Sequence, residues 1–210
     1  MDINVGYKPI RDAYKKLGHR FFANGDYNLN IGGIRSENST SDKFDDLVFA
    51  VYFIGGKPHF HTWPATTDPG KHWLLNPFSK DGTAILVPGQ HPGAYKLGIH
   101  GRTGKYPYKA LEQVKPMSYV RDDNRDHILD FNLYRDPELL IKHLFKAVIK
   151  SNIHRASKWR ILQLIGRYSA GCQVLQSAAD FDMLIYLAEK SAKTWGNSFT
   201  YTLFEERDFQ

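Results

Sequence analysis

Residues 47–67 read LVFAVYFIGGKPHFHTWPATT, and this stretch decides the fold class of the chain. Its first eight residues are apolar and rich in β-branched and aromatic side chains, which is typical of a buried strand. Gly55 and Gly56 follow, and paired glycines suit a tight hairpin turn because they accept positive φ angles. The residues from Lys57 onward then form the partner strand. The stretch therefore predicts a β-hairpin.

The same alternation of short strands and tight turns continues on both sides of this hairpin. Gly, Pro and Asp-Asn turns separate further strand candidates at residues 27–36, 83–90, 94–100, 117–122, 127–133 and 198–204. Residues 147–156, AVIKSNIHRA, alternate between apolar and polar and are also expected to form a strand. This pattern favours a mostly β fold, either a sandwich or a small barrel.

Two or three short helices are expected beside the strands. The first covers about residues 7–17 and stops at Gly18. A second begins at Asp136, a good cap residue that is followed by proline at the first helical position. The third begins at Ser177, where Asp180 completes a capping box.

Length and composition indicate one domain. The chain has 210 residues, of which 42% are hydrophobic and 14% aromatic, which is enough for one sizeable core. No linker, repeat or change of composition marks a second unit. We therefore expect a single domain over residues 1–210, with its core at about residues 27–210.

Charge and cysteine content narrow the possible partners. The formal net charge of +6 favours contact with polyanions, but the basic residues are scattered, so nucleic acid is not expected. The single cysteine rules out an intramolecular disulfide. The N-terminus lacks the apolar segment of a signal peptide, and no apolar run approaches the ~20 residues of a membrane span. We expect synthesis in the cytoplasm and no membrane span.

The single cysteine stands in an unusual setting, the segment SAGC at residues 169–172. Cysteine chemistry requires a thiolate, a base that takes the proton, and N–H donors aimed at the oxyanion. Gly171 allows a close backbone turn that exposes such donors, and Ser169 is placed to order the turn. The nearest histidine upstream is His154, and a strand and a returning loop would bring its imidazole to Cys172.

His154, fourteen intervening residues, and then Ser169-Ala170-Gly171-Cys172 resemble the active-site signature of the YkuD-type L,D-transpeptidases. The resemblance implies a mostly β fold in which Cys172 attacks an amide of a peptidoglycan stem peptide. It makes His154 the proton partner, Ser169 an orienting hydroxyl, and the N–H groups of Gly171 and Cys172 the oxyanion hole. The thioester would be resolved by an amine, as in transpeptidation, or by water, as in an L,D-carboxypeptidase or endopeptidase.

The chain differs from the family pattern around these residues. Arg155 replaces the usual glycine after the histidine, and Gln173 and Val174 replace a β-branched residue and an Arg or Asn after the cysteine. The substrate carboxylate therefore needs another partner. Arginines that could supply a bidentate contact are Arg155, Arg160 and Arg167. Gln173 and His100, a rival base in GIHG, are further candidates for lining the cleft.

Three readings of function follow. The first is a cell-wall enzyme, such as a phage or prophage endolysin or an injected antibacterial effector, that reaches the cell wall or periplasm after release by another route. The second is a non-catalytic module that binds the cell wall or a virion and keeps the fold. The third is a cysteine protease or amidase with a different substrate. No cofactor is expected, and the oligomeric state stays open.

Two possible metal sites have only weak support in the sequence. His59 and His61 would share one face of a strand, but no second ligand pair with metal spacing accompanies them. Asp122, Asn124 and Asp126 resemble the start of a calcium loop, but the expected glycine and the final glutamate are missing. We expect no metal at either place.

Overall fold

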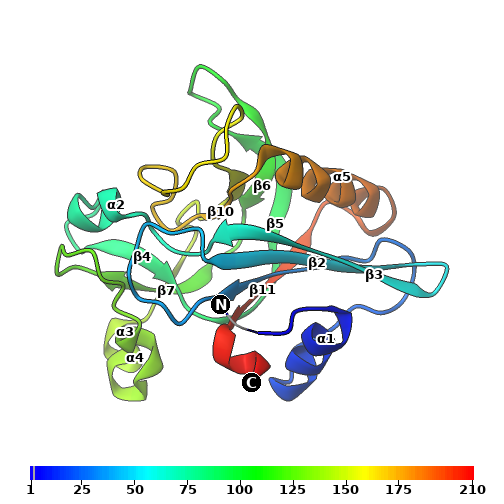
Figure 1. The fold of residues 1–210 in the computed structure, drawn as a ribbon, viewed down its shortest axis with the longest axis horizontal. Helices are drawn as coiled ribbons and strands as arrows, with labels where there is room; N and C mark the ends of the chain where they lie inside the picture. Colours follow the sequence, from blue (N-terminus) through cyan, green and yellow to red (C-terminus); the bar gives the residue numbers. More distant parts are fainter. Residues whose placement is uncertain (2) are drawn as a thin grey trace.

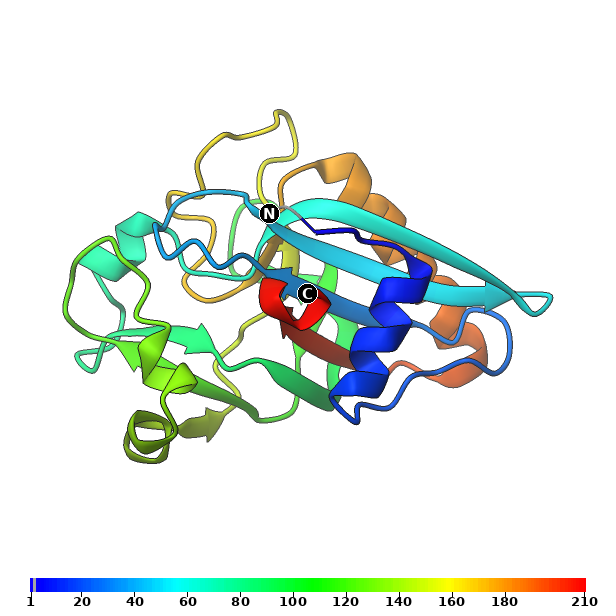
Figure 2. The ribbon, with the colours of Figure 1, turned by 60° about the horizontal axis from the view of Figure 1, so that its bottom comes forward.

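The structure is a computed structural model that describes Met1 and residues 3–210. Its body is a closed barrel of eight strands, beside which stands a three-stranded sheet (Figures 1 and 2). The barrel strands, in their order around the barrel, are β1 (Asn30–Arg35), β11 (Phe199–Glu205), β5 (Gly89–His100), β6 (Tyr108–Gln113), β9 (Ile153–Arg155), β10 (Gln173–Leu175), β3 (Lys57–Thr66) and β2 (Asp46–Ile54). The second sheet has the order β4 (Thr83–Leu86), β7 (Met117–Asp122) and β8 (Phe145–Ala147). The mostly β prediction is confirmed.

The described residues form five α-helices and one 3-10 helix. They are α1 (Tyr7–Lys16), α2 (Lys71–Leu75), α3 (Asn132–Arg135), α4 (Pro137–His143), α5 (Ala178–Trp195) and the 3-10 helix η1 (Glu206–Phe209). The three helices expected from the sequence correspond to α1, α4 and α5. With 18 residues α5 is longer than the short helices expected, and the Ser177 side chain accepts a hydrogen bond from the Asp180 amide at its start. The two additional helices have only four and five residues.

The quoted hairpin is present in register. Strands β2 and β3 pair without interruption from Asp46 opposite Ala65 to Ile54 opposite Lys57. Gly55 and Gly56 form the two-residue turn, and their φ angles of 56° and 76° are accessible to glycine at little cost. The sequence pattern therefore predicted both the strands and the turn.

Two apolar clusters hold the barrel together. The interior cluster joins barrel residues such as Trp63 and Tyr95 to the buried face of α5, including Phe181 and Leu184. On the outside, α1 packs Ile10, Ala13 and Tyr14 against side chains of β1, β2 and β11 (Figure 2). A helix therefore packs against the barrel on each of two sides: α5 contacts the interior cluster and α1 contacts the outer surface. Burial of these apolar side chains is the main source of the stability of the barrel.

Several strand predictions were wrong in their bounds. Residues 127–133 form no strand: Ile128 makes one isolated bridge, and α3 begins at Asn132. Residues 83–90 are divided between β4 and β5, because Pro88 lies between them and has no N–H to donate to a ladder. Residues 147–156 are likewise divided between β8 and β9. Strands β6 and β10 were not predicted at all.

A buried ion pair connects the barrel to the second sheet. Arg35 of β1 is fully buried, donates to the Leu86 carbonyl of β4 at 2.7 Å, and lies 2.8 Å from the Asp68 carboxylate. Burial raises the pKa of Asp68 although the nearby Arg35 guanidinium opposes that rise. Two residues further, the Gly70 amide donates to the Ser169 carbonyl at 2.8 Å. The same segment thus ties both sheets to the turn that carries the cysteine.

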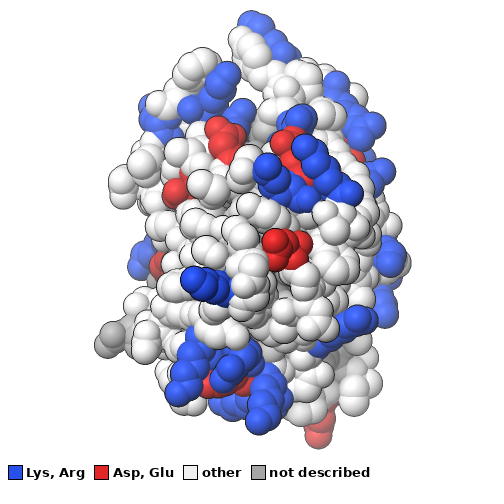
Figure 3. Space-filling model, turned by 90° about the vertical axis from the view of Figure 1, so that its right-hand side faces the viewer, with Lys and Arg blue, Asp and Glu red and all other residues white. Residues whose placement is uncertain are grey.

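No helix in the described part of the chain has the length and apolar character needed to cross a membrane. On the face shown in Figure 3, Lys and Arg form several separate clusters, and Asp or Glu lies beside some of them. The positive charge on this face is therefore divided among clusters, in agreement with the scattered pattern in the sequence.

Candidate active site

Cys172 follows a tight turn and comes immediately before β10. The Ser169 hydroxyl donates to the Cys172 carbonyl at 2.8 Å and accepts from the Gly171 amide at 3.2 Å. Ser169 is fully buried, so these bonds are shielded from water. Its hydroxyl therefore fixes the shape of the turn from inside.

Gly171 cannot be replaced without moving its neighbours. Its φ angle is 108°, which L side chains rarely adopt, and a Cβ atom there would lie 2.6 Å from the Ala84 carbonyl oxygen of β4. The Gly171 carbonyl also accepts the Ser151 hydroxyl at 2.6 Å. The turn is thus pressed against the second sheet, and this contact sets where the next residue, Cys172, can lie.

The thiol of Cys172 is partly exposed at a pocket of about 410 Å³. Its Sγ donates to the Lys150 carbonyl at 3.5 Å. Burial raises the pKa of the Cys172 thiol to about 11, and a hydrogen bond with the Asn152 backbone offsets only part of that rise. The group is therefore a neutral thiol at pH 7.

His154 lies in β9, the parallel neighbour of β10, directly opposite Val174. Its Nδ1 lies 2.8 Å from the Arg155 carbonyl oxygen, an acceptor, which assigns the proton to Nδ1 and leaves Nε2 as the basic nitrogen. Only 3% of the residue is exposed, and this burial, with the nearby His100, lowers the pKa of His154 to about 3. The imidazole is therefore neutral at pH 7.

The structure brings the predicted nucleophile and base to the ends of adjacent strands. Cys172 stands two residues before Val174, the register partner of His154. Within the described residues, however, no hydrogen bond joins the Cys172 sulfur to the imidazole, and the thiol bonds to Lys150 instead. The thiol and the imidazole are thus both neutral, lie on neighbouring segments of the chain, and do not form an ion pair.

Two more side chains surround the imidazole. The Tyr108 hydroxyl donates to the Arg155 carbonyl at 3.3 Å and lies 3.4 Å from His154 Nδ1. The His100 ring stacks on the His154 ring with 4.2 Å between centroids, and its Nδ1 lies 3.3 Å from Asn152 Nδ2. His100 is therefore a packing partner of His154. The sequence did not point to Tyr108, because its strand, β6, has no clear sequence pattern.

The oxyanion hole differs from the one that the resemblance implies. The Gly171 N–H already donates to Ser169, so the prediction that it binds substrate is not supported. Among the described residues, the Cys172 N–H has no protein acceptor. One of the two predicted donors therefore remains available to a substrate oxygen.

Two cations that sequence reasoning overlooked line the cysteine pocket. Arg121 reaches it from β7, anchored by a 2.7 Å hydrogen bond to the Gly82 carbonyl. Lys150, whose carbonyl accepts the thiol hydrogen bond, also lines the pocket and is exposed. Together they make the pocket attractive to a carboxylate. The sequence did not point to either residue, because Arg121 is distant from the motif and Lys150 lies outside the positions that the motif specifies.

The predicted substrate-binding residues do not gather at this pocket. The Arg155 guanidinium packs 3.9 Å from the centre of the Tyr108 ring and lines a different pocket, of about 580 Å³. Arg167 is exposed, and its carbonyl accepts a hydrogen bond from Trp73. Gln173 is fully buried and accepts from Tyr201 at 2.8 Å inside the barrel, so a role in substrate binding is not supported.

Neither a search for metal-binding groups nor a comparison with known proteins identifies a further feature of the site. No group of three His, Cys, Asp or Glu side chains among the described residues could hold a metal ion. No family model, curated protein or solved structure matches the chain. The case for function therefore depends on the site itself.

Proposed function

We propose that this protein is a cysteine acyl-transfer enzyme of the L,D-transpeptidase type that acts on peptidoglycan stem peptides. One observation carries the proposal. His154, whose Nε2 is the unprotonated ring nitrogen, lies on the strand beside the turn that presents Cys172 to a pocket. The sequence motif formed by His154, Ser169, Gly171 and Cys172 supports the same assignment.

The first step is the attack of sulfur on the peptide carbonyl. Because thiol and imidazole are both neutral at rest, the proton leaves Cys172 for His154 Nε2 as the S–C bond forms. The developing oxyanion is stabilised by the Cys172 N–H. The imidazolium then returns the proton to the departing amine, the C–N bond breaks, and a thioester remains.

The second step releases the acyl group from the sulfur. Water or an amine attacks the thioester carbonyl and gives its proton to His154, and the sulfur leaves as the thiolate and recovers the proton. Water yields a shortened stem peptide, whereas an amine yields a cross-link. Arg121 and Lys150 are the cations that we assign to the substrate carboxylate, in place of the arginines suggested by sequence.

Incubation with purified peptidoglycan, followed by chromatography of the muropeptides, tests the proposal. The wild-type protein should shorten or join stem peptides, and Cys172→Ala should abolish this change. Lys142→Gln, which alters an exposed side chain of α4, serves as the control with full activity. Unchanged muropeptides with the wild-type protein would contradict the proposal.

A non-catalytic wall-binding module is the second candidate, and one observation favours it. The thiol pKa is raised, and no hydrogen bond with the imidazole activates the sulfur among the described residues. If this reading is correct, the protein will sediment with peptidoglycan, Cys172→Ala will sediment equally well, and neither will alter the muropeptides.

A further inference from the structure

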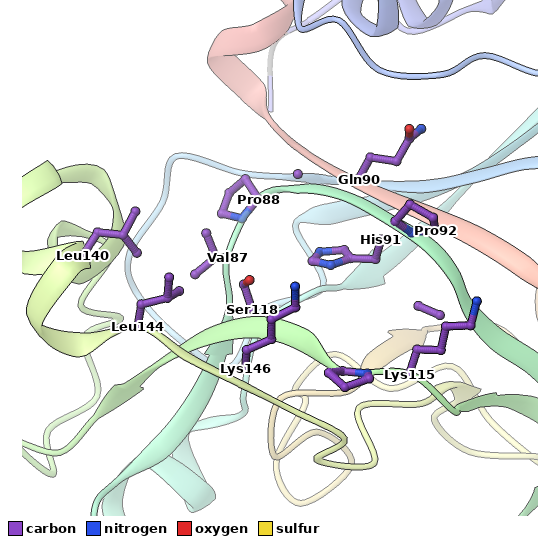
Figure 4. Close-up of a pocket in the computed structure, with 13 residues that line it drawn as sticks. Val87, Pro88, Gln90, His91, Pro92, Lys115, Ser118, Leu140, Leu144 and Lys146 are labelled. Atoms are coloured by element: carbon purple, nitrogen blue, oxygen red, sulfur yellow. The ribbon is translucent and has the colours of Figure 1, made fainter.

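A groove that lies away from the cysteine has a volume of about 620 Å³. It lies between the start of β5 and the second sheet, and the end of α4 forms one of its sides (Figure 4). Pockets of about 300–1,000 Å³ are typical of small-molecule sites. The groove therefore has room for a ligand the size of one or two amino acids.

His91 is one of the residues that line this groove. Its Nε2 is buried and has no hydrogen-bond partner, while the ring interacts with the Val87 backbone. Burial lowers the pKa of His91 to about 4, so the ring is neutral at pH 7. A buried acceptor without a partner is costly, and a ligand that donates an N–H or O–H would remove that cost.

Positive charge stands next to this acceptor. In Figure 4 the Lys146 side chain extends toward the His91 ring, and Lys115 lies at the other end of the groove. The Ser118 hydroxyl also points into the groove. Among the described residues that line it, none is acidic. The groove therefore favours an anion close to the donor that His91 requires.

The remaining walls are apolar. Pro88 precedes β5 and Pro92 belongs to it, Pro116 is the residue before β7, and Leu140 and Leu144 come from α4 and its end. Such walls favour a ligand that carries aliphatic substituents. An inorganic anion would leave them without contact.

We propose that this groove binds an N-acyl amino acid with an aliphatic side chain, the chemistry found at the C-terminus of a peptide. Its carboxylate pairs with Lys146, and the N–H on the neighbouring carbon donates to His91 Nε2. The acyl group and the side chain contact the proline and leucine walls. An α-hydroxy acid shares the donor beside the carboxylate but lacks the acyl group that would fill the rest of the groove.

Titration of the ¹⁵N-labelled protein with N-acetyl-L-leucine, followed by NMR, tests the proposal. Saturable shifts are expected at the amides of Gln90, His91 and Lys146. N-acetyl-L-leucinamide, without the carboxylate, and 4-methylpentanoate, without the N–H, should each bind at least about fivefold more weakly. Equal binding of either analogue would overturn the proposal, as would tighter binding of 2-hydroxy-4-methylpentanoate.

Matched variants locate the contacts. Lys146→Gln should weaken N-acetyl-L-leucine about fivefold or more, whereas Lys142→Gln removes the same charge outside the groove and should have no effect. His91→Phe keeps a ring of similar size and should also weaken binding. Equal affinity of Lys146→Gln and Lys142→Gln would overturn the proposal. The Cys172→Ala protein should bind as the wild type does, so this test is independent of the proposed enzymatic function.

Discussion

The two histidines at the two pockets, His154 and His91, are held alike but face different neighbours. Each ring interacts with a backbone carbonyl, that of Arg155 for His154 and that of Val87 for His91. Burial lowers both pKa values, to about 3 and about 4. Both rings are therefore neutral acceptors at pH 7.

What differs is the group opposite each ring. His154 lies on the strand beside the cysteine turn, and in the proposed mechanism it receives the proton of the thiol. His91 faces Lys146, whose positive charge further disfavours protonation of the ring. Burial keeps both rings neutral, and the difference between their neighbours is the reason why we assign His154 to chemistry and His91 to binding in the two proposals.

The largest expected effect separates the two rings by activity. His154→Gln should lower the rate of stem-peptide conversion by about 10²–10⁴-fold, because a neutral amide cannot accept the thiol proton. His91→Gln should leave that rate within about twofold. Rates of muropeptide conversion measure both. If the two variants lost activity equally, the distinction between the two regions would be wrong.

The second effect concerns the reactivity of Cys172. Because burial raises the pKa of its thiol to about 11, iodoacetamide should react at pH 7 roughly 10²-fold more slowly than with an exposed cysteine. The rate should rise with pH beyond 8.5. Mass spectrometry of the alkylated protein gives the rate constants. A plateau that begins near pH 6 and disappears in His154→Gln would instead indicate an ion pair at rest.

The third effect concerns the contribution of the tightly packed cysteine turn to the stability of the fold. Gly171→Ala should lower the free energy of unfolding by about 2 kcal/mol or more, because the new methyl meets the Ala84 carbonyl in a strained backbone conformation. Gly101→Ala is the control, since its φ of 67° is also positive but no atom lies within 4 Å of the added carbon. Urea unfolding compares them. A smaller loss for Gly171→Ala than for Gly101→Ala would refute the contact.

The smallest effect is on stability in acid. An unfolded histidine binds a proton below about pH 6.5, whereas folded His91 does so only near pH 4, so stability falls as pH decreases between these values. His91→Gln should reduce this slope by about 1.4 kcal/mol per pH unit at most. The exposed His127→Gln is the control. Urea unfolding at pH 7, 6 and 5 would give parallel lines for wild type and His91→Gln if the account were wrong.

Sequence reasoning worked where local pattern dominates. The hairpin at residues 47–67, the helix that starts after Ser177 and the last strand follow from turn glycines, a cap and alternation. It did not find β10, which has three residues and is stabilised by its neighbours β3 and β9 and not by its own composition. Short strands inside a barrel leave little trace in the sequence.

The candidate site likewise contains residues that a local sequence pattern could identify and residues that only the tertiary structure brings there. The spacing of His154 and Cys172 could be read from one segment, because both lie within 20 residues of each other. Arg121 and Tyr108 reach the region from β7 and β6, which no local pattern could place there. Gln173 was misassigned because sequence adjacency to the cysteine does not reveal that its side chain turns into the barrel.

Intact-protein mass spectrometry after incubation with a synthetic stem tetrapeptide tests the central claim most directly. The account predicts an adduct on Cys172 equal in mass to the peptide acyl group without its C-terminal D-residue, absent from Cys172→Ala and accumulating when the second step is slow. An intact peptide together with an unmodified Cys172 in the wild-type protein would contradict it.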